Sequence, residues 1–206
     1  PSTAPSNGYN YEVRTSGAAG SGATGLVSSG AVAAGIVTKD ITGLISATSY
    51  SVYVQSNCGS GDTSNWTAAG TFATTCTASS IPYTMPIEAV TVPALPLCTS
   101  VQNVNADAKT WVSYASITGI TGKVMGYSYS GTVAANDWLF TNSLTLNAGT
   151  TYQVKFKYKD TGYVEKLKVA YGIDANSTAM TTQLADHPNI TTATLQNNTV
   201  TFTPTV

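Results

Sequence analysis

Few side chains in this sequence could perform chemistry. His187 is the single histidine of the 206 residues, and a serine-type triad needs a histidine beside a nucleophile and a carboxylate. Asp186 precedes it directly. No serine, however, occupies the G-x-S-x-G turn that exposes such a nucleophile. The pattern therefore predicts a histidine in a surface loop and not a catalytic base.

The other reactive groups are ten carboxylates and three cysteines. Glycoside hydrolysis uses two carboxylates that face one cleft, but nothing in the spacing of the acids singles out a pair. Most of them lie in turn sequences, where an aspartate side chain binds its own backbone. Zinc requires clustered cysteine and histidine ligands, whereas here they are scattered singly. We therefore predict that the chain is not an enzyme.

Composition narrows the range of partners. Charged residues make up 9% of the chain and the net charge is −1, against about 25% charged residues in ordinary soluble proteins. Nucleic acid is not an expected partner because no basic surface is available for it. No apolar segment approaches the roughly 18 residues that cross a membrane, so membrane insertion is not expected. Abundant Thr, Ser, Ala, Gly and Val favour secreted β-sandwich modules.

The clearest structural signal is a strict alternation at residues 152–159, where every second residue is apolar and the residues between are Gln or Lys. A period of two predicts a strand with one buried and one solvated face. We expect it to form an antiparallel hairpin with residues 165–169. Similar alternation predicts strands at residues 9–13 and 50–54, and residues 36–41 are a further candidate. The glycine-rich residues 17–25 suggest a flexible connection. Short strands with regular turn signals indicate an all-β fold of two β-sandwich modules.

The first module resembles a known family. Ile41-Thr42-Gly43-Leu44, followed by Thr48-Ser49-Tyr50-Ser51-Val52-Tyr53-Val54, is similar to the end of a fibronectin type III domain. There the leucine begins the corner between strands E and F, and the tyrosine forms a tyrosine corner. The resemblance assigns residues 1–75 to a fibronectin type III-like unit. It implies that two N-terminal strands of the family lie outside this sequence.

Residues 76–98 form a proline-rich junction, and a second resemblance begins near Ser79. The matching residues are Ile81-Pro82-Tyr83, Glu88, Pro96-x-Cys98, Trp111, Asn136-Asp137-Trp138-Leu139, Leu146-x-Ala148-Gly149-Thr150-x-Tyr152 and Glu165-Lys166-Leu167-Lys168-Val169. They are similar to a jelly-roll family that includes the cleaved-adhesin and choice-of-anchor domains of secreted Bacteroidota surface proteins. The resemblance implies a jelly-roll domain at residues 99–206 whose closing strands follow the end of this sequence.

The jelly-roll resemblance implies a structural calcium ion. Calcium prefers oxygen ligands from loops that join strands, and the acids that match the family are Glu88 and Asp137, with Asn136 beside them. The alternative is that Asp137 caps a turn and Glu88 is solvated. We further predict a Cys76–Cys98 disulfide that pins the junction to the start of the jelly-roll. Cys58 then has no partner within the chain.

Trp66 is the candidate for carbohydrate binding, because it lies in a polar loop at residues 59–67. Packing into a core or corner is the alternative for this side chain. Together these features predict a non-catalytic, secreted or cell-surface segment of a larger protein. Its role would be adhesion, spacing or filament formation, and its partners would be other protein chains or the rest of the parent polypeptide. The alternative is an ancillary carbohydrate-binding module of a secreted enzyme, with surface glycans as partners.

Overall fold

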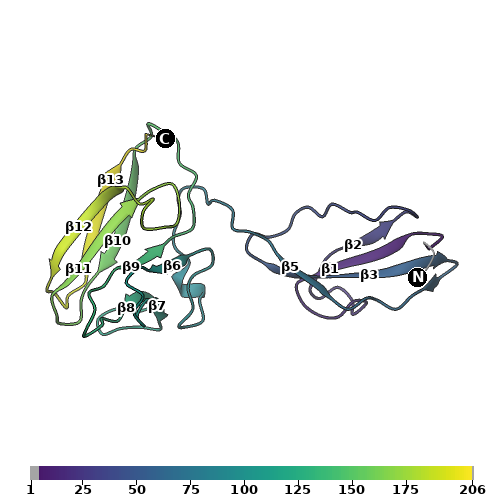
Figure 1. Ribbon diagram of the computed structural model, residues 1–206, viewed down its shortest axis with the longest axis horizontal. Coiled ribbons are helices and arrows are strands. Elements are labelled where there is room, and N and C mark those ends of the chain that lie inside the picture. The colour runs from purple at the N-terminus through teal and green to yellow at the C-terminus, as the bar shows by residue number, and fades with distance from the viewer. Residues whose placement is uncertain (1–4, 206) are drawn as a thin grey trace. The chain divides into compact units, whose positions relative to one another are not determined.

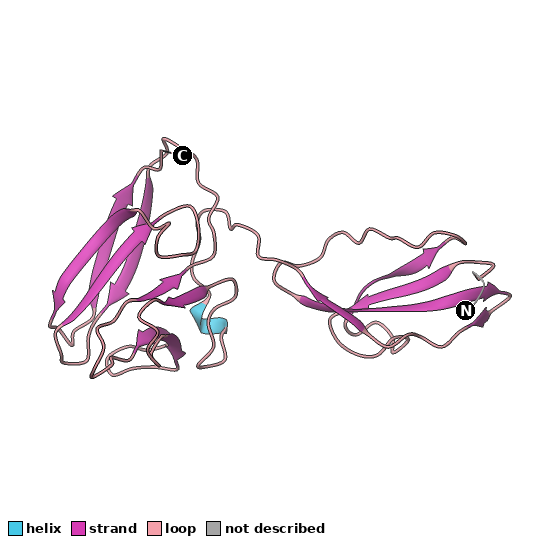
Figure 2. Cartoon of the chain, in the orientation of Figure 1, coloured by secondary structure: helices cyan, strands magenta, loops and turns pink. Residues whose placement is uncertain are grey.

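The computed structural model describes residues 5–205 and divides into two compact units, Pro1–Thr77 and Ala78–Val206. The predicted all-β class is confirmed, since strands form both units (Figure 2). A single 3-10 turn, η1 (Ile87–Ala89), is the only helical element within residues 5–205. None of the described segments is a helix long and apolar enough to cross a membrane.

The first unit is built on one antiparallel sheet (Figure 1). Its order is β2 (Leu26–Val32), β1 (Tyr9–Arg14), β3 (Ser49–Gly59) and β4 (Asp62–Thr63), and β5 (Gly70–Ala73) also pairs with β3. Val13 and Tyr50 are 1% and 2% exposed and form its core. The expectation of a strand at residues 36–41 was wrong: this segment forms no ladder, and Val37 is 83% exposed. A strand forms only where a neighbour satisfies its backbone groups.

A tyrosine corner precedes β3, as the fibronectin type III resemblance implies. The Tyr50 hydroxyl accepts a hydrogen bond from the Ile45 amide at 2.8 Å. The second unit repeats this arrangement, where the Tyr152 hydroxyl accepts from the Asn147 amide at 2.9 Å. Both corners fit Leu-x-x-x-Thr-x-Tyr, with the leucine at position 44 or 146. A residue with left-handed backbone lies between leucine and threonine in each, Ala47 at φ 50° and Gly149 at φ 75°.

The two corners predict reciprocal substitution effects. Ala47→Gly is expected to stabilise the protein by about 0.5–1 kcal/mol, because relief of the left-handed strain exceeds the entropy that glycine adds to the unfolded chain. Gly149→Ala is expected to destabilise by a similar amount for conformational reasons alone, since a Cβ there meets nothing within 4 Å. Urea unfolding of both variants measures the two changes. A destabilised Ala47→Gly variant would contradict this account of the corner.

In the second unit, β10 (Tyr152–Tyr158) pairs with β13 (Gln196–Phe202), and β11 (Glu165–Tyr171) pairs with β12 (Thr182–Ile190). The two ribbons pack face to face. The Tyr171 and Phe202 rings lie 4.8 Å apart between centroids, and those of Phe156 and His187 lie 6.0 Å apart.

The expectation of a hairpin between β10 and β11 was therefore wrong. Each strand directs its alternating apolar side chains toward the opposite ribbon, so the two lie in different layers. The connection is fixed by Asp160, which is 6% exposed. The Asp160 carboxylate accepts hydrogen bonds from the backbone amides of Gly162 and Tyr163. The backbone amide of Asp160 donates to the Thr192 carbonyl. These bonds turn the chain from one layer to the other.

Two shorter ribbons complete the second unit. β6 (Ser100–Asn103) pairs with β9 (Asp137–Phe140), and β7 (Trp111–Tyr114) pairs with β8 (Val124–Tyr127). The Trp111 indole donates to the Asp137 carbonyl at 3.0 Å and so ties one ribbon to the other. Buried apolar side chains of this unit include Val90, Phe140 and Ile190.

Candidate functional site

Polar side chains converge where the short ribbons of the second unit end. We call this set the oxygen cluster: Asn103, Asn105, Asp107, Tyr127 and Asp137. Asn103 is the last residue of β6 and lies directly opposite Asp137, the first residue of β9. Asn105 and Asp107 follow in the loop between β6 and β7, and Tyr127 ends β8 opposite Trp111. The sheet registers thus bring together residues that are far apart in sequence.

Hydrogen bonds hold the loop of the oxygen cluster in place. The Asn103 amide group donates to the carbonyls of Asp107 at 2.5 Å and Lys109 at 2.9 Å. That of Asn105 donates to the Ala134 carbonyl at 2.8 Å. One carboxylate oxygen of Asp107 accepts from the Lys109 amide at 2.7 Å. The NH₂ groups of both asparagines are thus engaged, and their side-chain oxygens remain as acceptors.

Several of these oxygens are buried without a partner in the described part of the chain. They are Oδ1 of Asn103, Oδ1 of Asn105, the Tyr127 hydroxyl and both carboxylate oxygens of Asp137. The hydroxyl of Thr110, which follows Lys109, has none either. A buried polar atom left unsatisfied costs about 1–3 kcal/mol. So many in one place point to a missing partner.

The electrostatics of the oxygen cluster are uniformly negative. Burial raises the pKa of the Asp137 carboxyl, the Tyr127 hydroxyl partly offsets this rise, and the charge of Asp107 raises the pKa further. Burial also raises the pKa of Tyr127 to about 12, with Asp137 and Asp107 adding to the effect. The Tyr127 hydroxyl is close enough to Asp137 for each to affect the other's pKa, but it does not meet hydrogen-bond geometry. Every charge that perturbs either group is an anion.

The predicted calcium ligands are only partly found together. Asp137 belongs to the oxygen cluster, whereas Asn136 accepts from the Trp138 indole at 3.1 Å. Glu88 is exposed and accepts from the Lys123 amide at 3.0 Å, and the Lys123 ammonium donates to the Glu88 carbonyl at 2.8 Å. In residues 5–205 no three side chains of the His, Cys, Asp and Glu types converge. The oxygen cluster depends on amide oxygens as well as carboxylates, and sequence reasoning missed it. Its signal was the alternation Asn103-x-Asn105-x-Asp107, which begins at the last residue of a strand.

The predicted disulfide is confirmed. Cys76 and Cys98 are bonded to each other, and Cys58 is free and exposed on β3. The bridge closes the proline-rich segment between the two cysteines. It is the sequence prediction about individual residues that the structure supports most directly.

Trp66, the candidate for carbohydrate binding, is half-buried in the first unit. Its indole nitrogen lies 3.5 Å from the point that a Cβ on Gly20 would occupy, so the ring packs beside the glycine-rich loop at residues 17–25. The Tyr53 hydroxyl donates to the Gly17 carbonyl of the same loop at 3.3 Å. The Trp66 ring therefore packs against this loop, and part of the ring remains exposed to solvent.

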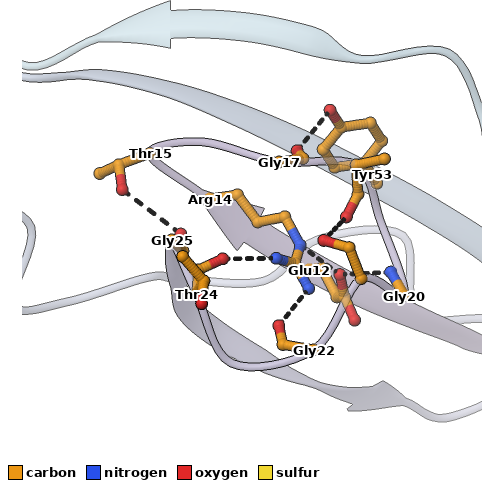
Figure 3. A network of polar contacts seen from close by, with 11 residues as sticks. Glu12, Arg14, Thr15, Gly17, Gly20, Gly22, Thr24, Gly25 and Tyr53 are labelled. Atoms are coloured by element: carbon orange, nitrogen blue, oxygen red, sulfur yellow. Dashed lines mark hydrogen bonds and ion pairs between the residues drawn. The ribbon is translucent and has the colours of Figure 1, made fainter.

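The glycine-rich loop was expected to be a flexible connection, but a buried ion pair anchors it (Figure 3). Arg14 is fully buried and donates to Glu12 at 2.6 Å, to the Thr24 carbonyl at 3.1 Å and to the Gly22 carbonyl at 2.8 Å. Glu12 also accepts from the Gly20 amide at 3.0 Å. The bond from Arg14 lowers the pKa of Glu12. The two charged side chains of β1 thus bind the backbone of the loop at Gly20, Gly22 and Thr24.

The expectation that His187 lies in a surface loop was wrong. It is half-buried on β12, and its ring lies 4.3 Å from that of Tyr158 between centroids. Nδ1 is 3.1 Å from the Tyr158 hydroxyl, and Nε2 is 3.0 Å from the Asn198 amide. The alternation of β12 turns this side chain toward the opposite ribbon. Both ring nitrogens of His187 therefore contact side chains of the opposite ribbon, Tyr158 on β10 and Asn198 on β13.

Comparison of the chain with protein-family models, curated proteins and solved structures finds no match.

Proposed function

We propose that this chain is a non-catalytic extracellular segment of a larger secreted or surface protein, with a structural and adhesive role. The observation that carries the proposal is the Cys76–Cys98 disulfide in an all-β chain with 9% charged residues. Disulfides persist in oxidising compartments and are rare in the cytosol. The resemblances to fibronectin type III and cleaved-adhesin domains support the same role.

The environment of the reactive side chains supports a role without catalysis. A general base needs a nitrogen that can reach a substrate proton, whereas the two ring nitrogens of His187 already face Tyr158 and Asn198. Glu12 is bound to Arg14, and Glu88 to the Lys123 amide. His187, Glu12 and Glu88 are thus each bound to a neighbouring group of the folded chain, which favours a structural role for them.

The edge of the first sheet supports association with other chains. β2 lies at one end of the strand order and pairs with β1. Its sequence, LVSSGAV, contains no charge and no proline. Edge strands that avoid pairing carry charges, prolines or bulges. β2 has one such feature at its start, where the register shifts because Val13 pairs with Ser28 and Arg14 with Leu26. The rest of the strand, Ser28 to Val32, pairs with β1 without interruption. An uncharged edge instead favours addition of a strand from another chain, which is one route to a fibre.

The test places a charge on that edge. Val27 on β2 is 42% exposed, and Val37, outside any strand, is 83% exposed. Concentration-dependent association of the purified chain, measured by analytical ultracentrifugation and electron microscopy, is expected to be lost in Val27→Lys and kept in Val37→Lys. A wild-type chain that stays monomeric at all concentrations would count against assembly through β2.

The second candidate function is an ancillary carbohydrate-binding module, favoured by the part of the Trp66 ring that remains open. A glycan array separates the two. Binding that disappears in Trp66→Ala would support the carbohydrate-binding module. Attachment to cells or fibre formation without glycan binding would support the adhesive role.

A further inference from the structure

We propose that the exposed rings of Tyr129 and Tyr163 form a platform on which a neutral sugar ring of a glycan stacks. The platform lies on the second unit, and the sequence did not indicate either tyrosine as a candidate. The proposal rests on the second candidate function, carbohydrate binding, and assigns that binding to a site other than Trp66.

The exposure of the two rings is the first argument. Most aromatic side chains in residues 5–205 are buried or half-buried, and three are exposed: Phe72 at 40%, Tyr129 at 60% and Tyr163 at 67%. Phe72 stacks on Tyr50 within the first sheet. The two most exposed rings instead meet each other, with centroids 5.7 Å apart and planes tilted by 43°. Apolar surface that is gathered and left open in this way is typical of a binding site.

Hydrogen bonds hold the two loops that carry the rings. Tyr129 lies just after β8, and Tyr163 lies just before β11. The buried carboxylate of Asp160 accepts from the Tyr163 amide at 3.0 Å. In the other loop the Ser130 hydroxyl accepts from the Val133 amide at 3.2 Å. A platform on loops that are already ordered loses less conformational entropy when a ligand binds.

The surroundings of the rings favour a neutral ligand. Asp160 is the one charged residue of residues 128–134 and 160–164, and it is 6% exposed. The exposed surface of both loops therefore carries no charge that would attract an ionic partner. A cationic side chain also binds tyrosine faces, but no exposed carboxylate of these loops would pair with it.

The chemistry of a sugar ring matches this surface. Its C–H groups are attracted to the negative face of an aromatic ring. Its hydroxyls need hydrogen-bond partners, which the hydroxyls of the two tyrosines offer. The same loops carry further exposed hydroxyl side chains, namely those of Ser128, Thr132 and Thr161. Two aromatic faces with hydroxyl groups around them thus fit a neutral oligosaccharide.

Glycan binding by the whole chain tests the proposal. The probes are an array of neutral and sialylated oligosaccharides, a lysine-rich peptide and a proline-rich peptide. We expect the wild type to bind neutral oligosaccharides. Tyr129→Ala and Tyr163→Ala are each expected to weaken this binding by about tenfold or more, because each removes one ring face. Tyr163→Phe keeps the face and should retain the affinity within about threefold.

Two controls separate this platform from the alternatives. Trp66→Ala, in the first unit, is expected to bind as the wild type does. The tyrosine variants should keep the wild-type Tm within about 2 °C, because both side chains are exposed.

Three results would overturn the assignment to the tyrosine pair. The first is loss of binding in Trp66→Ala with binding kept in both tyrosine variants, and the second is binding to sialylated oligosaccharides alone. The third is binding of either peptide through the tyrosines without binding of any oligosaccharide. A wild type that binds no oligosaccharide would overturn this proposal together with the second candidate function, and the adhesive role would stand or fall by its own test.

Discussion

Replacing Arg14 with alanine is expected to destabilise the first unit by about 3–5 kcal/mol, because breaking a buried ion pair leaves one charge uncompensated. Arg14 is fully buried and the Glu12 side chain is only 13% exposed. The substitution also removes the donors that hold the carbonyls of Gly22 and Thr24. Urea unfolding measures the stability loss, and limited proteolysis at residues 17–25 reports whether the loop has been released.

The matched control removes both charges at once. In the double variant Arg14→Met, Glu12→Leu no buried charge is left alone, so much of the lost stability should return. If the double variant were as unstable as Arg14→Ala, the loop carbonyls and not the unpaired charge would dominate the effect. The single variants Arg14→Met and Glu12→Leu complete a double-mutant cycle, which separates the two contributions.

The same pair makes stability depend on pH. The pKa of Glu12 is lowered from 4.5 in the folded protein, because Arg14 donates a hydrogen bond to the carboxylate. The unfolded chain therefore takes up the proton first as the pH falls. The stabilising effect of the pair is present above a pH of about 4.5 and is lost as the pH falls through the folded pKa. Arg14→Met should reduce this loss, and identical profiles for the wild type and the variant between about pH 6 and pH 3 would argue against the pair.

Loss of the Cys76–Cys98 disulfide is expected to cost about 3 kcal/mol, because the bridge restricts the unfolded chain across a loop of moderate length. The double variant Cys76→Ser, Cys98→Ser should show this change in urea unfolding. Reduction of the wild type should give a similar value. The matched control is Cys58→Ser, since Cys58 is free and exposed and its replacement should change stability by less than about 0.5 kcal/mol.

Peptide mapping under non-reducing conditions provides an independent check on the pairing. The expected result is one cross-linked peptide that contains Cys76 and Cys98, with Cys58 labelled by a thiol reagent. Labelling of all three cysteines in the untreated protein would contradict the pairing. A bridge that includes Cys58 would contradict it as well.

The sequence by itself determined the local structure of this protein. Alternating apolar residues located β1, β3 and β10, because a half-buried strand needs one apolar face. The resemblance of residues 41–54 to a fibronectin type III domain located the first tyrosine corner, whose hydrogen bond joins residues only five apart. The disulfide was also predicted correctly, because few cysteines were available.

Only the tertiary structure decided which of these pieces meet. Alternation shows that a strand has an apolar face but not which strand covers it, so β10 pairs with β13 and not with β11. The roles of Arg14 and His187 depend on neighbours that come from distant parts of the chain. The oxygen cluster depends on the register that places Asn103 opposite Asp137. Register follows from the packing of whole layers, and no short stretch of sequence contains that information.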